Sequence, residues 1–174
     1  MPSPRVPLVE LPPAPTIALD VVAWAGLSFA VGYLTHRQPV DRYARDGALT
    51  RLRAFEAGGR WYERRLRIGA WKGRVPEAGG FYEGGYSKAA IADRSSANLE
   101  RYAAETRRAE LTHWLLMACG PLFAIWNPPV AVAAHVAYAV GANLPCIAIQ
   151  RYNRARLQRV LDRRAARAQS LSIR

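Results

Sequence analysis

The sequence predicts an all-α integral membrane protein with about three transmembrane helices, cytoplasmic interfacial helices and a Gly-rich loop. The chain of 174 residues is 51% hydrophobic, yet its formal net charge is +12. Charge and apolar residues are segregated along the chain, because three apolar segments contain no Lys or Arg. A helix needs roughly 20 apolar residues to cross a hydrocarbon core. The predicted spans are residues 16–35, 111–126 and 128–150.

The N-terminal residues 1–15 contain six prolines, which predicts an extended, Pro-rich leader. The first span follows at 16–35 and contains Asp20. A cleaved signal peptide is the alternative for this segment. The single Arg of the leader, the length of the apolar run and the lack of a small-x-small site favour an uncleaved anchor.

Residues 36–110 form a basic segment with sixteen Lys and Arg against ten Asp and Glu. Within it, leucine and phenylalanine at helical spacing predict a helix over 41–57, which Gly58 and Gly59 end. Two glycine pairs predict a loop over 78–88.

The next helix is expected to begin at a Ser95 or Ser96 N-cap and to continue into the second span, because nothing breaks it before Gly120 and Pro121. After the Asn127-Pro128-Pro129 turn, the third span extends to about residue 150. Residues 151–174 then place leucine, valine and alanine on one face and arginines on the other, which predicts a basic amphipathic helix on the inner leaflet.

The distribution of basic residues predicts the orientation. The N-terminal end has one Lys or Arg, residues 36–110 have sixteen, the Asn-Pro-Pro turn has none and the tail 151–174 has eight. The positive-inside rule therefore places the N-terminus outside and both basic regions in the cytoplasm. We expect a multi-pass protein of the cell membrane.

The basic regions are expected to contact membrane lipids rather than nucleic acid. The sequence pI is about 10.6, but no nucleic-acid motif is present, and basic segments next to spans face anionic headgroups. Cys119 and Cys146 are expected at different depths and hence unpaired. The sequence does not predict an oligomeric state.

Residue counting brings polar side chains of two spans to the same depth. His113 lies 14 positions before Asn127, and Asn143 lies 14 positions after Pro129. Both should therefore sit about 20 Å from the outer turn, near the inner headgroups. Glu110 precedes His113 by three positions and so shares its helix face.

These residues suit proton transfer, and we take His113, Glu110 and Asn143 as candidate catalytic residues. A carboxylate beside an imidazole raises its basicity, so His113 would accept a proton from an alcohol. Asn143 or Thr112 would bind the developing oxyanion, and Arg151 and Arg154 a substrate anion. The candidate substrate-binding residues are Arg108, Thr112, Gln150, Arg151, Asn153 and Arg154. The alternative is that His113 only satisfies a helix neighbour at the interface. No metal site is expected.

Two further pairs lie outside this group. Asp20 and His135 have similar depths near the outer face, and we expect a structural ion pair between them. His36 and Asp41 have the His-x4-Asp spacing of glycerolipid acyltransferases, but the pattern is short and Pro39 lies inside it.

Several motifs make the chain resemble the glycosyl-4,4'-diaponeurosporenoate acyltransferase family of carotenoid biosynthesis. The motifs are Trp61…Trp71-Lys72, Glu105-Thr106-x-Arg108-Ala109-Glu110-Leu111-x-His113-Trp114, Asn143-x-Pro145 and Gln150-Arg151-Tyr152-Asn153-Arg154-x-Arg156-Leu157.

The resemblance implies esterification of a sugar hydroxyl of a glycosylated carotenoid, or a similar glycolipid, with a fatty acyl group. The acyl donor, acyl-CoA or an acyl carrier, would be a co-substrate, and no cofactor is expected. The alternatives are another group transfer to an isoprenoid lipid and a non-enzymatic membrane adaptor.

Overall fold

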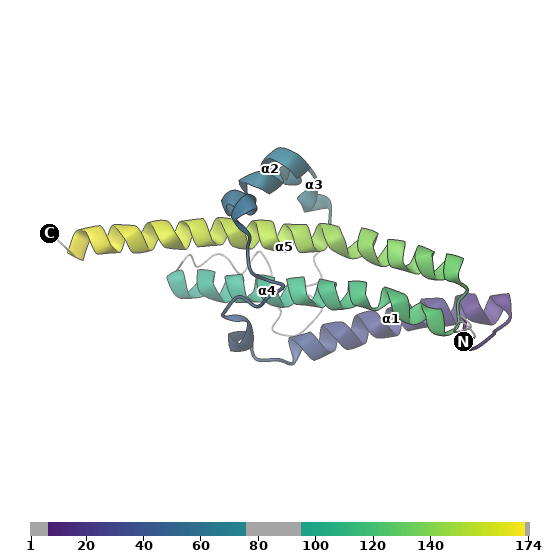
Figure 1. Ribbon diagram of the computed structural model, residues 1–174. Coiled ribbons are helices and arrows are strands. Elements are labelled where there is room, and N and C mark those ends of the chain that lie inside the picture. The colour runs from purple at the N-terminus through teal and green to yellow at the C-terminus, as the bar shows by residue number, and fades with distance from the viewer. Residues whose placement is uncertain (1–6, 76–94, 173–174) are drawn as a thin grey trace, which may run out of the picture.

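The computed structural model describes residues 7–75 and 95–172, which form α-helices and short 3₁₀ helices and no strand. This confirms the all-α class. Three long helices lie side by side, with α4 antiparallel to the other two (Figure 1). They are α1 (Pro13–His36), α4 (Ser96–Ala118) and α5 (Pro129–Ser172). The expected Gly-rich loop at 78–88 and the first six residues of the leader lie outside the described residues.

The first helix begins inside the predicted leader. Pro13 occupies its first turn, where the missing N–H of proline has no helical partner to lose. The backbone N–H groups of Leu8 and Val9 both donate to the carbonyl of Ile125, each at 2.9 Å. The end of the leader therefore lies against the connection between α4 and α5.

The prediction of a helix over 41–57 is wrong. The structure has two short 3₁₀ helices there, η1 (Val40–Tyr43) and η2 (Ala54–Gly59), joined by an irregular segment. Ala57, Gly58 and Gly59 have φ values of 48°, 63° and 95°. Glycine adopts this left-handed region without strain, whereas alanine is strained there. The chain consequently turns sharply before α2 (Arg60–Leu66).

Helix α4 begins where predicted, because Ser95 is its N-cap and its hydroxyl accepts a hydrogen bond from the Asn98 N–H at 3.3 Å. It ends before Gly120, and the 3₁₀ helix η6 (Gly120–Ile125) follows with Pro121 in its first turn. The predicted span 111–126 is thus part α-helix and part 3₁₀ helix. Gly120 allows close packing, since a Cβ there would lie 3.2 Å from the Val136 Cα.

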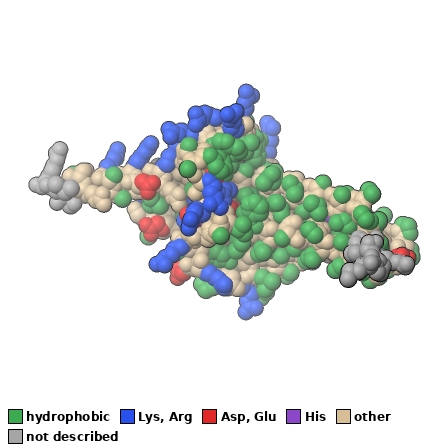
Figure 2. Space-filling model, in the orientation of Figure 1, with side chains coloured by type: hydrophobic (Ala, Val, Ile, Leu, Met, Phe, Trp, Pro, Cys, Tyr) green, Lys and Arg blue, Asp and Glu red, His purple; other side chains and the backbone are tan. Residues whose placement is uncertain are grey.

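The predicted third span and basic tail form one helix. Helix α5 has 44 residues and continues through Pro145, which gives it a length of about 66 Å. Two of the described helices are long and apolar enough to cross a membrane, namely α1 and α5. Hydrophobic side chains cover one half of the visible face, whereas Lys and Arg gather on the half that carries α2 (Figure 2).

The second, short layer packs on the opposite side of α5 from α4 (Figure 1). It consists of α2, α3 (Ile68–Trp71) and the 3₁₀ helix η3 (Lys72–Arg74). Tyr62 and Ile68 from this layer pack with Ile149 and Tyr152 of α5 in the main hydrophobic cluster. Helix α5 is therefore covered on both sides at the level where the polar site lies.

Candidate active site

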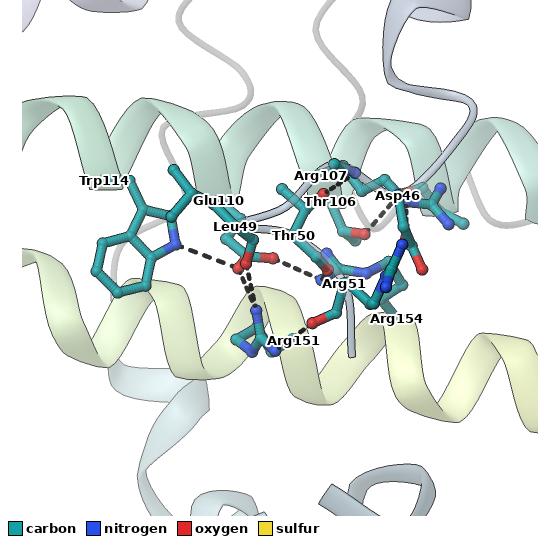
Figure 3. A network of polar contacts seen from close by, with 12 residues as sticks. Asp46, Leu49, Thr50, Arg51, Thr106, Arg107, Glu110, Trp114, Arg151 and Arg154 are labelled. Atoms are coloured by element: carbon teal, nitrogen blue, oxygen red, sulfur yellow. Dashed lines mark hydrogen bonds and ion pairs between the residues drawn. The ribbon is translucent and has the colours of Figure 1, made fainter. Parts of the chain in front are cut away.

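A buried ionic cluster joins α4 to α5 and is centred on Glu110. The Glu110 side chain is fully buried and binds two arginines of α5. Arg151 Nη1 donates to its Oε1 at 2.6 Å, and Arg154 Nη2 donates to its Oε2 at 2.5 Å. The Trp114 indole N–H also donates to Oε1, at 3.3 Å. Figure 3 shows Glu110 pointing from α4 toward both arginines.

Arg151 also holds the irregular segment against the helices. Its Nε and Nη2 donate to the two carboxylate oxygens of Glu56, each at 2.9 Å. Its remaining N–H groups donate to the backbone carbonyls of Leu49 and Arg51. A guanidinium has five N–H donors, and all five are used here. Arg151 therefore has no donor left for a substrate anion in this structure.

Glu56 is kept ionised by this arrangement. Burial alone would raise its pKa, but hydrogen bonds from Arg151, Tyr62 and the Arg53 backbone outweigh it and lower the pKa below the ordinary value. The Tyr62 hydroxyl donates to Glu56 Oε1 at 2.5 Å, and burial together with this carboxylate raises the pKa of Tyr62. Sequence reasoning missed Glu56. The one signal was a single acidic residue among the three arginines of 51–60.

Arg154 is fully buried and only partly satisfied. Its Nη2 donates to Glu110 and to the Thr50 carbonyl, whereas its Nε and Nη1 have no partner within the described part of the chain. Arg107 nearby pairs with Asp46 at 2.5 Å. The cluster thus contains three guanidinium groups and three carboxylates, so it is electrically balanced. The carboxylates belong to Asp46, Glu56 and Glu110.

His113 meets Asn143 one helical turn further along α4. Its Nδ1 lies 2.9 Å from the Asn143 Oδ1, which confirms that the two residues share a depth. His113 is half-buried and Asn143 is buried. Glu110, which was expected to orient the imidazole, instead binds Arg151 and Arg154. The group that contacts the ring is therefore an amide and not a carboxylate.

The hydrogen bonds of Asn143 assign the protons of the imidazole. The Asn143 Nδ2 lies 2.9 Å from the Ala139 carbonyl. A carbonyl only accepts, so the amide must present its NH₂ group there and its oxygen to His113. Nδ1 of His113 must consequently carry a proton. The lone pair of the neutral ring is then on Nε2, which makes no hydrogen bond to any described residue.

Arg108 and Thr112 face α1 and not His113. The Thr112 hydroxyl forms a 2.9 Å hydrogen bond with the Thr35 hydroxyl of α1, in which either group can donate. It also lies 3.0 Å from the Arg108 carbonyl oxygen, which can accept from it. Arg108 pairs with Glu105 at 2.5 Å and donates to the carbonyl of His36. These two candidate substrate-binding residues therefore link α4 to the C-terminal end of α1.

The remaining candidates are dispersed. Gln150 and Asn153 on α5 are half-buried and make no hydrogen bond to another described residue. His36 ends α1, whereas Asp41 lies in η1 and lines a cleft with Arg107.

The expected pair between Asp20 and His135 is present. His135 Nε2 lies 3.3 Å from the Asp20 carboxylate, and the Trp24 indole donates to His135 Nδ1 at 3.0 Å. Trp126 and Asn127 donate to the other Asp20 oxygen, each at 2.8 Å. Both ring nitrogens of His135 are occupied, which is what a structural link between α1, η6 and α5 requires.

Comparison with known proteins identifies the family. A sequence model of the glycosyl-4,4'-diaponeurosporenoate acyltransferase family matches residues 44–163. A protein of that name from Staphylococcus haemolyticus is 31% identical over 144 residues, covering 83% of this chain and 84% of its own. One from Staphylococcus aureus is 28% identical over 149 residues, covering 83% and 88%. No solved structure matches.

The matched region includes α4, most of α5 and the irregular segment whose Glu56 binds Arg151. It therefore contains the whole ionic cluster and the pair formed by His113 and Asn143. On this evidence the chain belongs to the glycosyl-4,4'-diaponeurosporenoate acyltransferase family.

Proposed function

We propose that this acyltransferase esterifies a sugar hydroxyl of a glycosylated carotenoid, with His113 as the general base. The observation that carries the assignment is the hydrogen bond from His113 Nδ1–H to Asn143, because it leaves Nε2 as a free proton acceptor. Relatives of the chain have acyltransferase names that specify a glycosyl-diaponeurosporenoate acceptor.

In the proposed reaction, His113 Nε2 takes the proton of the sugar hydroxyl as its oxygen attacks a thioester carbonyl. The new C–O bond forms, the C–S bond breaks, and the leaving thiolate receives the proton back from Nε2. During this step the imidazole is transiently cationic, and the Asn143 oxygen stabilises it through Nδ1–H. Asn143 is then a positioning residue and not the oxyanion donor.

The site is held in place by the ion pairs of Glu110 with Arg151 and Arg154. These ion pairs fix the register of α4 against α5, and that register brings His113 opposite Asn143. In this assignment Arg151 positions other groups, since its donors are all used by the protein.

The test is acyl transfer by membranes that contain the His113→Ala variant. We expect the rate of ester formation from a labelled acyl thioester and a glycosylated carotenoid to fall about 100-fold or more. Leu115→Ala is the matched control, because Leu115 is exposed two positions along α4. Full activity of a normally inserted His113→Ala protein would exclude His113 as the base.

We further infer three membrane passes, with the N-terminus outside and both 36–110 and the C-terminal tail in the cytoplasm. Support comes from the apolar helices α1 and α5 and from the charge difference between the two ends. The orientation can be tested with the single-cysteine variants Val9→Cys and Ser170→Cys, made in a chain in which both native cysteines are replaced. An impermeant maleimide should label the first from outside intact cells and the second only in inverted vesicles. Labelling of Ser170→Cys in intact cells would contradict this orientation.

A further inference from the structure

A basic cleft lies on the tail side of the ionic cluster, between η2 and the C-terminal part of α5. Its volume is about 360 Å³. Arg53 and Arg60 line it from the η2 side, and Arg159 lines it from α5. Leu52 and Ala155 contribute apolar surface to the same cleft.

The three arginines keep most of their donors available. Arg53 donates one terminal N–H to the Ala48 carbonyl, and Arg60 donates its Nε to the Ala57 carbonyl. Arg159 makes no ion pair or hydrogen bond to any described residue. Since each guanidinium has five N–H groups, most of the donors around the cleft are unused.

Arg159 packs closely against the backbone of Gly58, which forms part of the cleft wall. A Cβ at Gly58 would lie 2.7 Å from the Arg159 Cδ, so the arginine stem rests directly on the glycine backbone. Gly58 has a left-handed φ of 63°, which glycine alone adopts readily. The Cγ, Cδ and Nε atoms of Arg159 therefore pack against Gly58 at the wall of the cleft.

The charge of the cleft favours a multiply charged anion. Two carboxylates line it, Glu56 and Asp162. Glu56 is buried and neutralised by Arg151, so three guanidinium groups face one exposed carboxylate. Arginine binds phosphate through paired N–H groups, and each charge-assisted hydrogen bond is stronger than a neutral one.

We propose that this cleft binds the phosphate groups of a coenzyme A thioester, the acyl donor of the proposed reaction. The assignment rests on the proposed function for the identity of the donor. Asn143 lies 12 residues before Ala155 and 16 before Arg159 on the same helix, a separation of about 18 to 24 Å. An extended pantetheine arm together with its pyrophosphate is of comparable length, so phosphates held in the cleft would bring the thioester toward His113.

The experiment measures binding of coenzyme A to the full-length protein purified in detergent, by calorimetry. Wild-type protein should bind coenzyme A more tightly than 3'-dephospho-coenzyme A and much more tightly than pantetheine. Arg159→Gln and Arg60→Gln should each weaken coenzyme A binding about tenfold or more. Arg167→Gln is the matched control, because Arg167 is exposed two turns further along α5 and does not line the cleft.

Several results would overturn the proposal. Equal affinity for pantetheine and coenzyme A would show that the phosphates are not recognised. Unchanged binding of coenzyme A by Arg159→Gln would show that the cleft is not the binding site. Arg159-dependent binding to phosphatidylglycerol vesicles, without binding of coenzyme A, would assign the cleft to a lipid headgroup. His113→Ala separates the two proposals, because it should bind coenzyme A normally even though it no longer transfers the acyl group.

Discussion

The side chain of Asn143 determines which nitrogen of His113 carries a proton. Its NH₂ group is committed to the carbonyl of Ala139, one turn earlier in α5, so its oxygen must face the imidazole. Removing this amide should impair the reaction without removing the base. We expect Asn143→Leu to lower kcat about tenfold or more with little change in KM for the acceptor.

Leu144→Ala is the control for Asn143→Leu, since Leu144 is exposed at the next position of the same helix. Kinetics of both variants in matched membranes would check the prediction. A changed KM with an unchanged kcat would indicate that Asn143 binds substrate and does not orient His113.

Glu110 should be essential for stability because its removal leaves a buried, unpaired guanidinium. Glu110→Gln is expected to destabilise the protein by about 3 to 5 kcal/mol, measured by denaturant unfolding in detergent. The double variant Glu110→Leu/Arg154→Met should be more stable than Glu110→Gln, because it removes both charges. A double variant less stable than Glu110→Gln would contradict this account of Glu110 and Arg154.

Stability should fall in acid because of Glu56. Its pKa is lower in the folded protein than its ordinary value of 4.5, so ionised Glu56 favours folding. This contribution is fully present above about pH 5 and is lost as the pH falls through the folded pKa. Unfolding midpoints measured from neutral to acidic pH would show the loss. Glu56→Gln should be less stable at neutral pH and should flatten the acid dependence.

Gly120 and Gly141 should respond oppositely to the same substitution. A Cβ at Gly120 would press on the backbone of α5 at Val136, whereas nothing lies within 4 Å of a Cβ at Gly141. Gly120→Leu is therefore expected to cost about 1 to 3 kcal/mol through overpacking. Gly141→Leu should be neutral or stabilising, because leucine favours the helix more than glycine. Thermal unfolding of both variants tests the close contact between η6 and α5.

The sequence predicted the part of the site that depends on helix geometry. Counting from the Asn-Pro-Pro turn brought His113 and Asn143 to one depth, and their 2.9 Å contact confirms it. The Asp20–His135 pair was predictable by the same counting, because a regular helix converts sequence separation into distance. The Ser95 cap was predictable for a different reason, namely the preference of serine for the N-cap position of helices.

The partners of Glu110 and Arg151 could not be predicted in this way. Glu56 lies 95 positions from Arg151, in a segment built from 3₁₀ turns and left-handed residues. Such a segment has no regular sequence periodicity from which the course of its backbone could be predicted. The apolar spacing over 41–57 resembled a helix, but Gly47 and the turn after Ala57 direct the chain otherwise.

The unbroken course of α5 has a consequence for substrate choice. Asn143 and Arg159 lie on the same uninterrupted helix, so the distance between Arg159 in the basic cleft and the residue that contacts His113 is set by α5 itself. Because α5 sets this distance, the acyl donor must be long enough to span it. Donors with a shortened arm should dock and fail to react, whatever acyl chain they carry.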